Sequence, residues 1–415
     1  MKFDKLPLSE DILRNLTDLN LFRTTDIQYK SIPSILRGED VLAIAQTGTG
    51  KTMAFAIPIV DRIHSAKSSK RVDGITCLIM VPTRELAQQI GEVFNSLTRH
   101  TRVKAFALYG GLEQDPQIKK LQDGIDILIT TPGRMFDLIS QGFVNIDNIQ
   151  TFVLDEADHM LDLGFIEDIE SIKRKLTRGH QTLFFSATIN PKIKRLAYSQ
   201  VRSSAIRIQI SPEDPVSKNV SHFVMFMEMD DKRFFLAEYM KQNPEGKFIV
   251  FVRTRVRAER VATAMARVEI ASLTLHGEKD QADRSEVMRK FRSGECRLLI
   301  ATDLSARGID IPDVTHVINY DIPEKPENYV HRIGRTGRGF NKGLAVSFCA
   351  PLEKPQLDEI QELLGKEIDV IKVSRVDYSM IVDPPDLDQS LSELIASEEA
   401  RIKNKGKGKK KKYSK

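Results

Sequence analysis

The chain has 415 residues, which is enough for two or three domains that each have a core. Its 41% hydrophobic and 29% charged residues exclude a disordered chain and a membrane bundle, and the acids of MKFDKLPLSED exclude a signal peptide, so we expect a cytoplasmic protein without a membrane partner. The net charge is +5, but residues 401–415 alone contribute +9, so the remaining chain sums to −4.

Short apolar runs alternate with longer amphipathic stretches along most of the chain, a rhythm typical of a parallel sheet with crossover helices. In the first half the predicted strands are VLAIAQ (41–46), TCLIMVP (76–82), KAFALYG (104–110), DILITTP (126–132), TFVLDEAD (151–158) and QTLFFSAT (181–188). In the second half they are HFVMFME (222–228), KFIVFVRT (247–254), RLLIATD (297–303), HVINYDI (316–322) and GLAVSFCA (343–350). The fold class is therefore α/β.

The polar segment SPEDPVSKN (211–219) interrupts this rhythm and predicts a linker between two α/β domains. After residue 375 the strands stop, and a basic tail follows. We therefore predict a first domain over 1–212, a linker over 213–219, a second domain over 220–375 and an extension over 376–415. Its lysine-rich end is predicted to be disordered.

The segment 45–52 is the strongest single motif, because it follows a predicted strand and opens a predicted helix. Its glycines let backbone N–H groups turn toward phosphate oxygens, Lys51 can reach the β- and γ-phosphates, and Thr52 offers a hydroxyl to Mg²⁺. A glycine-rich turn that binds nothing is the alternative. The predicted phosphate-binding residues are Ala45, Gln46, Thr47, Gly48, Thr49, Gly50, Lys51 and Thr52.

A second acidic element stands at the end of the predicted strand 151–154, in the sequence VLDEAD. Asp155 suits Mg²⁺, and Glu156 suits the orientation or deprotonation of an attacking water. Alone, this cluster would more often be the start of a solvated helix, but its pairing with 45–52 favours phosphoryl transfer.

The second predicted domain carries the segment HRIGRTGR (331–338), in which glycines separate arginines that could surround one anion. Phosphoryl transfer commonly uses an arginine from outside the phosphate-binding domain. The alternative is a generic basic turn. If Arg335 and Arg338 act on ATP, the complete site exists only when the two domains close.

These motifs together resemble the DEAD-box ATP-dependent RNA helicases, and the compact bacterial members most. The match runs in order from about Phe3 to Arg338 and includes PTREL (82–86), TPGR (131–134), the Ser-Ala-Thr of 186–188, VFVRT (250–254) and ATDLSARGIDI (301–311). The resemblance implies two tandem recA-like domains, with ATP and Mg²⁺ as cofactors and RNA as partner. Ribonucleoprotein or ribosome-assembly partners and a monomeric state are further expectations.

Residue roles also follow from the resemblance. Gln28 matches the residue that reads adenine, and Asp310 matches the acid that holds the ribose. Lys51, Asp155, Glu156, Arg335 and Arg338 match the catalytic set, and Asp158, Ser186, Thr188 and His331 match the network that couples ATP to strand separation. RNA contacts are implied at Pro82, Thr83, Arg84, Gly110, Gly111, Thr131, Pro132, Gly133 and Arg134, and at Arg253, Thr254, Arg284, Thr302 and Asp303. These residue types suit phosphates and sugars, so binding should be largely independent of RNA sequence.

The sequence departs from the family pattern upstream of Gln28. Leu21 stands where an aromatic residue normally stacks on adenine, and Thr24 stands where a proline stiffens the turn. Either position 21 faces adenine without an aromatic ring, or Phe22 replaces it by a shift of register.

The resemblance implies an RNA-stimulated ATPase that unwinds duplexes locally. An ATP-gated RNA clamp without productive unwinding is the alternative, and a DNA translocase is a third hypothesis that the motif set disfavours. For the tail, anchoring to RNA competes with a role in solubility alone.

Overall fold

The structure is a computed structural model of the 415-residue chain. It describes residues 1–46, 48–69, 74–210, 216–306, 311, 313–337, 341–373, 378 and 381–382. Outside the described residues lie the predicted site residues Thr47, Asp310 and Arg338, part of the predicted linker and the tail that is predicted to be disordered.

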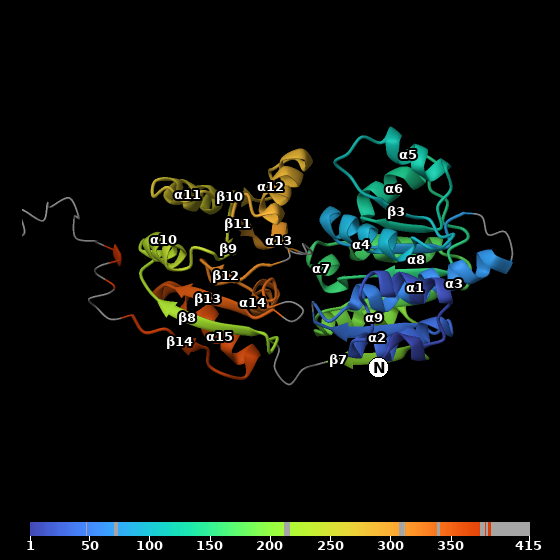
Figure 1. Ribbon diagram of the computed structural model, residues 1–415, viewed down its shortest axis with the longest axis horizontal. Coiled ribbons are helices and arrows are strands. Elements are labelled where there is room, and N and C mark those ends of the chain that lie inside the picture. The colour runs from blue at the N-terminus through green and yellow to red at the C-terminus, as the bar shows by residue number, and fades with distance from the viewer. Residues whose placement is uncertain are drawn as a thin grey trace, which may run out of the picture.

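Two seven-stranded sheets dominate the structure, one in each half of the chain, and they lie side by side in Figure 1. The first sheet has the order β3-β4-β2-β5-β6-β1-β7, and every pairing is parallel. Its strands are β1 (Val41–Ala45), β2 (Cys77–Met80), β3 (Ala105–Leu108), β4 (Ile127–Thr130), β5 (Thr151–Leu154), β6 (Gln181–Ser186) and β7 (Ile206–Ile210).

Helices cover both faces of the first sheet. They are α1 (Glu10–Asp18), α2 (Asp26–Leu36), α3 (Lys51–Ser69), α4 (Arg84–Leu97), α5 (Asp115–Gln122), α6 (Pro132–Ser140), α7 (Ala157–Asp162), α8 (Ile166–Lys175) and α9 (Pro191–Gln200), preceded by the 3-10 turn η1 (Phe3–Lys5). Helices α1–α4 contribute to one hydrophobic core, and α5–α9 contribute to the other.

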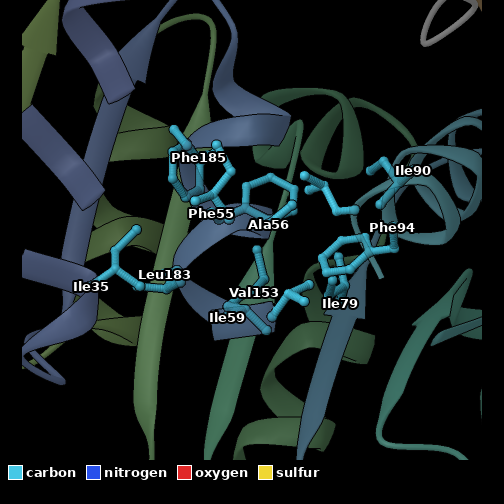
Figure 2. Packing of buried hydrophobic residues seen from close by; sticks show 14 of the residues in the cluster. Ile35, Phe55, Ala56, Ile59, Ile79, Ile90, Phe94, Val153, Leu183 and Phe185 are labelled. Carbon is cyan, nitrogen blue, oxygen red and sulfur yellow. The ribbon is translucent and has the colours of Figure 1, made fainter. Parts of the chain in front are cut away.

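The strands divide their side chains between these two cores. In β1, Val41 and Ala43 face the first core, whereas Leu42 and Ile44 face the second, as the alternation of a strand requires. Figure 2 shows the first core, where Phe55 of α3 packs against Phe185 of β6 with ring centroids 5.2 Å apart. Both faces are buried, which explains why the strands read as continuous apolar runs.

The second sheet has the order β10-β11-β9-β12-β13-β8-β14 and is also parallel throughout. Its strands are β8 (Val220–Phe226), β9 (Phe248–Val252), β10 (Leu273–Leu275), β11 (Leu298–Thr302), β12 (His316–Asn319), β13 (Gly343–Cys349) and β14 (Asp369–Val370). The helices are α10 (Lys232–Gln242), α11 (Arg255–Ala266), α12 (Gln281–Ser293), α13 (Asp303–Ala306), α14 (Pro326–Ile333) and α15 (Lys354–Leu364), with the 3-10 turn η2 (Pro351–Glu353) before α15.

The predicted fold class is confirmed by these two parallel sheets and their helical layers. Strands β7, β10 and β14 have no counterpart among the predicted runs. They are an edge strand with alternating exposure, a three-residue strand and a two-residue strand, so none contains a long apolar run. Within the described residues, no helix is both long and apolar enough to cross a membrane.

Candidate active site

The predicted phosphate loop connects β1 to α3. Gly48 and Gly50 have φ angles of +80° and +90°, which residues with a Cβ atom rarely adopt. Lys51 is 7% exposed and its ammonium group donates a 2.7 Å hydrogen bond to the Ala45 carbonyl, while Thr49 donates one of 2.7 Å to the Gln46 carbonyl. The loop therefore ends at the N-terminus of a 19-residue helix, where anions are favoured. Thr52, the predicted Mg²⁺ residue, lies in the first turn of that helix.

Gln28 is fixed against this loop. Its Nε2 donates to the Gly50 carbonyl at 3.2 Å, and its Oε1 accepts from the Thr25 N–H at 3.0 Å. A Cβ atom on Gly50 would lie only 2.5 Å from the Gln28 Nε2, so glycine is needed for this contact as well as for φ. The side chain predicted to read adenine is thus held beside the loop predicted to bind phosphate.

Leu21 and Phe22, the two candidates for the adenine contact upstream of Gln28, differ in exposure. Leu21 packs against the first core, whereas the Phe22 side chain is 57% exposed. The backbone around them is held by the N-terminus: Phe3 donates to the Phe22 carbonyl, and Thr24 donates to the Met1 carbonyl at 2.9 Å. This bracing holds the turn that has threonine in place of the family's proline.

Asp155 and Glu156 follow β5 at the edge of the sheet where the phosphate loop lies. Asp155 is buried, its Oδ1 accepts from the Glu156 N–H at 2.9 Å, and burial raises its pKa to about 7 although Lys51 acts in the opposite direction. Burial would also raise the pKa of Glu156, but the hydrogen bond with His159 and the charges of Arg335 and Lys51 lower it to about 2.

Glu156 also has a constrained backbone. It adopts the left-handed conformation, with φ 50° and ψ 47°, directly before α7. For a residue with a side chain this costs on the order of 1–3 kcal/mol, and such conformations concentrate at functional sites. Mg²⁺ binds carboxylates in their ionised form, so a cation beside Asp155 would counteract the effect of burial on its pKa, while the ionised Glu156 can accept a proton from water.

Three of the four predicted coupling residues lie together. Asp158 Oδ2 accepts hydrogen bonds from the Thr188 N–H and hydroxyl, both at 3.0 Å, and from the Ala187 N–H at 3.2 Å. Ser186 donates to the Thr188 carbonyl at 2.9 Å. His331, from α14 of the second domain, shares with Thr188 the lining of a cavity of about 240 Å³ between the domains.

Arg335 reaches the nucleotide side from the second domain. It is 5% exposed, its Nε donates to the His331 carbonyl at 3.2 Å, and its charge is one of those that lower the pKa of Glu156. A guanidinium from one domain therefore acts electrostatically on a carboxylate of the other.

The predicted RNA residues of the first domain follow the carboxyl ends of β2, β3 and β4. Thr83 caps α4 by accepting from the Leu86 N–H at 3.3 Å, and Arg134 donates to the Leu112 carbonyl at 3.0 Å. A Cβ atom on Gly111 would lie 2.2 Å from an Arg84 Nη1, so the chain passes very close to that guanidinium. The others are Pro82, which precedes the cap, Gly110 beside Arg84, and Thr131, Pro132 and Gly133 at the start of α6.

The predicted RNA residues of the second domain also follow strand ends. Thr254 caps α11 by accepting from the Arg257 N–H at 3.2 Å. Thr302 ends β11, and Asp303 forms a two-pronged ion pair with the buried Arg332, at 2.5 and 2.8 Å. Asp303 thus has a structural partner in addition to its predicted role.

Two of these sets meet across the domain boundary. Arg284 of α12 pairs with Glu85 of α4 through its Nε at 2.7 Å, and Arg84 donates to Gln281 at 3.4 Å. Lys325 and Asp162 form a third cross-domain contact at 3.0 Å. Glu85 was not predicted as a site residue, although it stands inside PTREL, because its partner is 199 residues away in the sequence.

A buried charge network behind Arg253 was also missed. Lys232 is fully buried, donates to the Tyr320 carbonyl at 2.7 Å and pairs with Glu353, which is 3.6 Å from an Arg253 Nη2. The Arg253 N–H in turn donates to Asp321 at 2.9 Å. An ion pair with Glu353 therefore holds the guanidinium of Arg253, and a hydrogen bond to Asp321 holds its main chain.

Comparison with known proteins identifies the family. Residues 25–196 match the family described as DEAD/DEAH box helicase, and residues 231–339 match the helicase conserved C-terminal domain. The DEAD-box ATP-dependent RNA helicase CshA of Bacillus cereus (strain ATCC 10987 / NRS 248) is 40% identical over 381 residues, which cover 91% of this chain and 71% of CshA.

Solved structures agree with this assignment. Saccharomyces cerevisiae Dbp5 bound to RNA and ADP BeF3 superposes with a TM-score of 0.82 at 29% identity, covering 92% of this chain and 98% of that one. A Dbp5 variant bound to Nup159, Gle1, IP6 and ADP superposes with a TM-score of only 0.61 at 28% identity, covering 90% and 97%. The same variant bound to RNA and ADP BeF3 again gives 0.82, so the domains of this chain are arranged more like those of the RNA-bound form. The chain therefore belongs to the DEAD-box ATP-dependent RNA helicases, enzymes that hydrolyse ATP and are built from two recA-like domains.

Proposed function

We propose that this protein is an RNA-stimulated ATPase that closes its two domains on one RNA strand and thereby opens short duplexes. The proposal is supported mainly by two separate interactions between the domains. On the nucleotide side Arg335 acts on Glu156, and on the RNA side Arg284 pairs with Glu85. One closure would therefore complete both sites, which links RNA binding to ATP turnover.

In the nucleotide site, Lys51 would leave the Ala45 carbonyl and bind the β- and γ-phosphates, while Gln28 would contact adenine. Asp155 and Thr52 would hold Mg²⁺, and this ion would supply charge neutralisation at the phosphates when bound. The fit is supported by the buried Asp155 carboxyl, because Mg²⁺ sites usually combine one or two carboxylates with substrate phosphates.

Hydrolysis would depend on residues from both domains. Glu156, which is ionised because its pKa is lowered to about 2, would orient the attacking water and accept its proton. Arg335 would stabilise the negative charge that develops on the γ-phosphoryl oxygens, and Arg338 is proposed to assist it. Both roles require the closed arrangement.

The RNA side would hold a single strand by its backbone. Arg84 and Arg134 of the first domain and Arg253 of the second can pair with phosphates, and the glycines at 110 and 111 let the strand approach the main chain. Residues on two domains can bend one strand, and a bent strand cannot remain in a regular duplex. The Asp158–Thr188 contact, with His331 across the same cavity, would transmit this closure to Glu156 two residues away.

The test compares ATP hydrolysis with RNA and with DNA of equal sequence, together with an unwinding readout. The expected result is stimulation by RNA alone and loss of a short duplex. Arg335→Ala should lower kcat by on the order of 10³-fold at saturating RNA. Equal stimulation by DNA, or a change smaller than about tenfold in the Arg335 variant, would contradict the proposal. Retention of RNA for many minutes with ATP and slow phosphate release would favour the clamp instead.

A further inference from the structure

A groove rich in arginine lies outside the site described so far. It has a volume of about 660 Å³ and opens between α10 and α11, which Figure 1 places on the side of the second domain that faces away from the first. Five arginines and three carboxylates line it: Arg233, Arg255, Arg257, Arg260 and Arg267, with Asp230, Glu259 and Glu278. We call this cavity the arginine groove.

Two of the three carboxylates of the groove are already occupied. Glu278 pairs with Arg255, and Glu259 contacts His276 at 2.8 Å. Arg257 is held by Asp321 beneath the groove, at 2.8 Å. Glu278 is therefore neutralised by an arginine, and Glu259 is engaged by a histidine of the same lining.

Three other arginines remain available to a ligand. Arg233, Arg260 and Arg267 are exposed, and within the part of the chain that the structure describes no carboxylate lies within 4 Å of their charged groups. Exposed arginines that gather around one cavity without acidic partners form a site for a polyanion rather than a network that stabilises the fold.

The spacing of the arginines suits an extended ligand. Arg260, Ala264 and Arg267 stand at i, i+4 and i+7, so they share one face of the α11 region, with the small Thr263 beside them. Seven residues of helix rise about 10.5 Å, so two guanidinium groups flank a shallow stretch lined by small side chains. A chain that carries regularly spaced phosphates can lie along this stretch and contact both guanidinium groups.

The groove continues the predicted RNA edge. Helix α11 starts at Arg255, immediately after Arg253 and the capping Thr254, so its first turn belongs to both regions. The groove is also lined by His276 and Tyr320, which directly follow β10 and β12. A strand that leaves the Arg253–Thr254 contact therefore meets the arginine groove next.

Tyr378 is fixed beside the same groove. The Tyr378 hydroxyl donates to Asp231 at 2.7 Å and accepts from the Glu228 N–H at 3.0 Å, and its ring lies 5.0 Å from that of Phe235. Met229 and Asp230, between these partners, line the groove. The sequence after Tyr378 leads to residues 401–415, which contain nine Lys/Arg and no acid. Tyr378 therefore packs directly beside residues that line the groove.

We infer that the arginine groove binds the phosphates of an RNA segment that flanks the strand held between the two domains. This inference deepens the proposed function and rests on it. Arg260 and Arg267 contact the backbone of the flanking segment, so binding there is independent of base sequence and is weakened by salt. Long RNAs are held more tightly than RNAs that fill only the contacts between the domains.

The test uses the full chain with Arg260→Gln and Arg267→Gln combined. Affinity and ATPase activity are measured with a short single-stranded RNA and with RNAs extended by about ten nucleotides at either end. For one of the extended RNAs the double variant should raise Kd about five- to tenfold at low salt and lower the salt slope by about 1.4, which is two phosphate contacts. Kd and kcat with the short RNA should stay within twofold of wild type.

The matched control removes two exposed arginines from elsewhere, by Arg174→Gln and Arg289→Gln. Arg174 pairs with Glu170 of its own helix, and Arg289 pairs with Glu286 and Glu295. If this control weakens long-RNA binding equally, or if the groove variant binds long RNA with unchanged Kd and salt slope, the groove does not bind RNA. Binding of a polyglutamate peptide that the groove variant loses, with long-RNA affinity intact, would instead assign the groove to an acidic protein. Absence of ATPase stimulation by the short RNA in the wild type would overturn the proposed function itself.

Discussion

At the scale of single residues, Glu156 is the side chain whose replacement should separate binding from hydrolysis. Glu156→Gln preserves size and leaves Asp155 and Lys51 in place, so ATP and RNA affinities should stay within about twofold of wild type. Single-turnover hydrolysis with RNA should fall by on the order of 10²–10⁴-fold, because only water activation is lost. Asp155→Asn serves as the control, since it should weaken ATP binding in the presence of Mg²⁺. Hydrolysis by the Glu156 variant at a near wild-type rate would exclude this role.

Phe22 gives the second prediction at this scale. The ring of Phe22 is 57% exposed, whereas Leu21 is committed to the first core, so Phe22 is the side chain available to stack on adenine. Phe22→Ser should weaken ATP binding by about 0.5–1.5 kcal/mol, the usual size of an aromatic contact. Titration with a fluorescent ATP analogue measures this.

Tyr29→Ser is the matched control, because Tyr29 is also a half-exposed aromatic residue and lies nearby, on α2. An unchanged affinity in the Phe22 variant, together with tighter binding by Leu21→Phe, would return the adenine contact to position 21.

The local motifs could be predicted because their residues are close together in the sequence. Glycines at 48 and 50 and the acids after β5 act within a few residues of each other, so the sequence order indicates the geometry. Lys232 could not be predicted in this way. It reads as a surface lysine of α10 and is fully buried only because Glu353, 121 residues later, folds against it.

At the scale of elements, the first turns of α4 and α12 meet across the domain boundary. Glu85→Gln and Arg284→Gln should each reduce RNA-stimulated ATPase activity. The double variant should be as active as the less active of the two single variants. A double-mutant cycle should therefore give a coupling energy of about 0.5–3 kcal/mol, because the pair is nearly buried at 2.5–2.7 Å.

The cross-domain pair of Lys325 and Asp162 provides the comparison. The Lys325 side chain is 62% exposed, so the same cycle with Lys325→Gln and Asp162→Asn should give a coupling energy close to zero. Additive effects of Glu85 and Arg284 would mean that they act separately and do not hold the domains together.

Most strands could be predicted from apolar runs, because both faces of each sheet are buried. The same logic fails at the edges. Strand β7 pairs on one side only with β1, and its alternate residues are exposed, so its sequence carries no continuous run. Tyr378 was assigned to an extension beyond the second domain, yet it packs on Phe235, since a single aromatic anchor leaves no periodic pattern.

At the scale of the whole molecule, the proposed activity depends on how the two domains move together. The sequence indicated two domains but not their contacts, because these involve side chains far apart in the chain. Arg335 lowers the pKa of Glu156 across the domain boundary, in an arrangement that resembles RNA-bound Dbp5 more than Dbp5 bound to Nup159, Gle1, IP6 and ADP.

The measurement that tests this most directly is the distance between the domains, followed by energy transfer between dyes. The dyes are attached at two exposed positions, through Lys120→Cys on α5 and Gln242→Cys on α10. Cys296→Ser removes the partly exposed native cysteine, whereas Cys77 and Cys349 are buried and can stay. The proposed mechanism predicts a single closed population only when ATP and RNA are both bound, with reopening after hydrolysis. An identical closed population with ATP alone, or rapid RNA-stimulated hydrolysis while the distance stays constant, would contradict it.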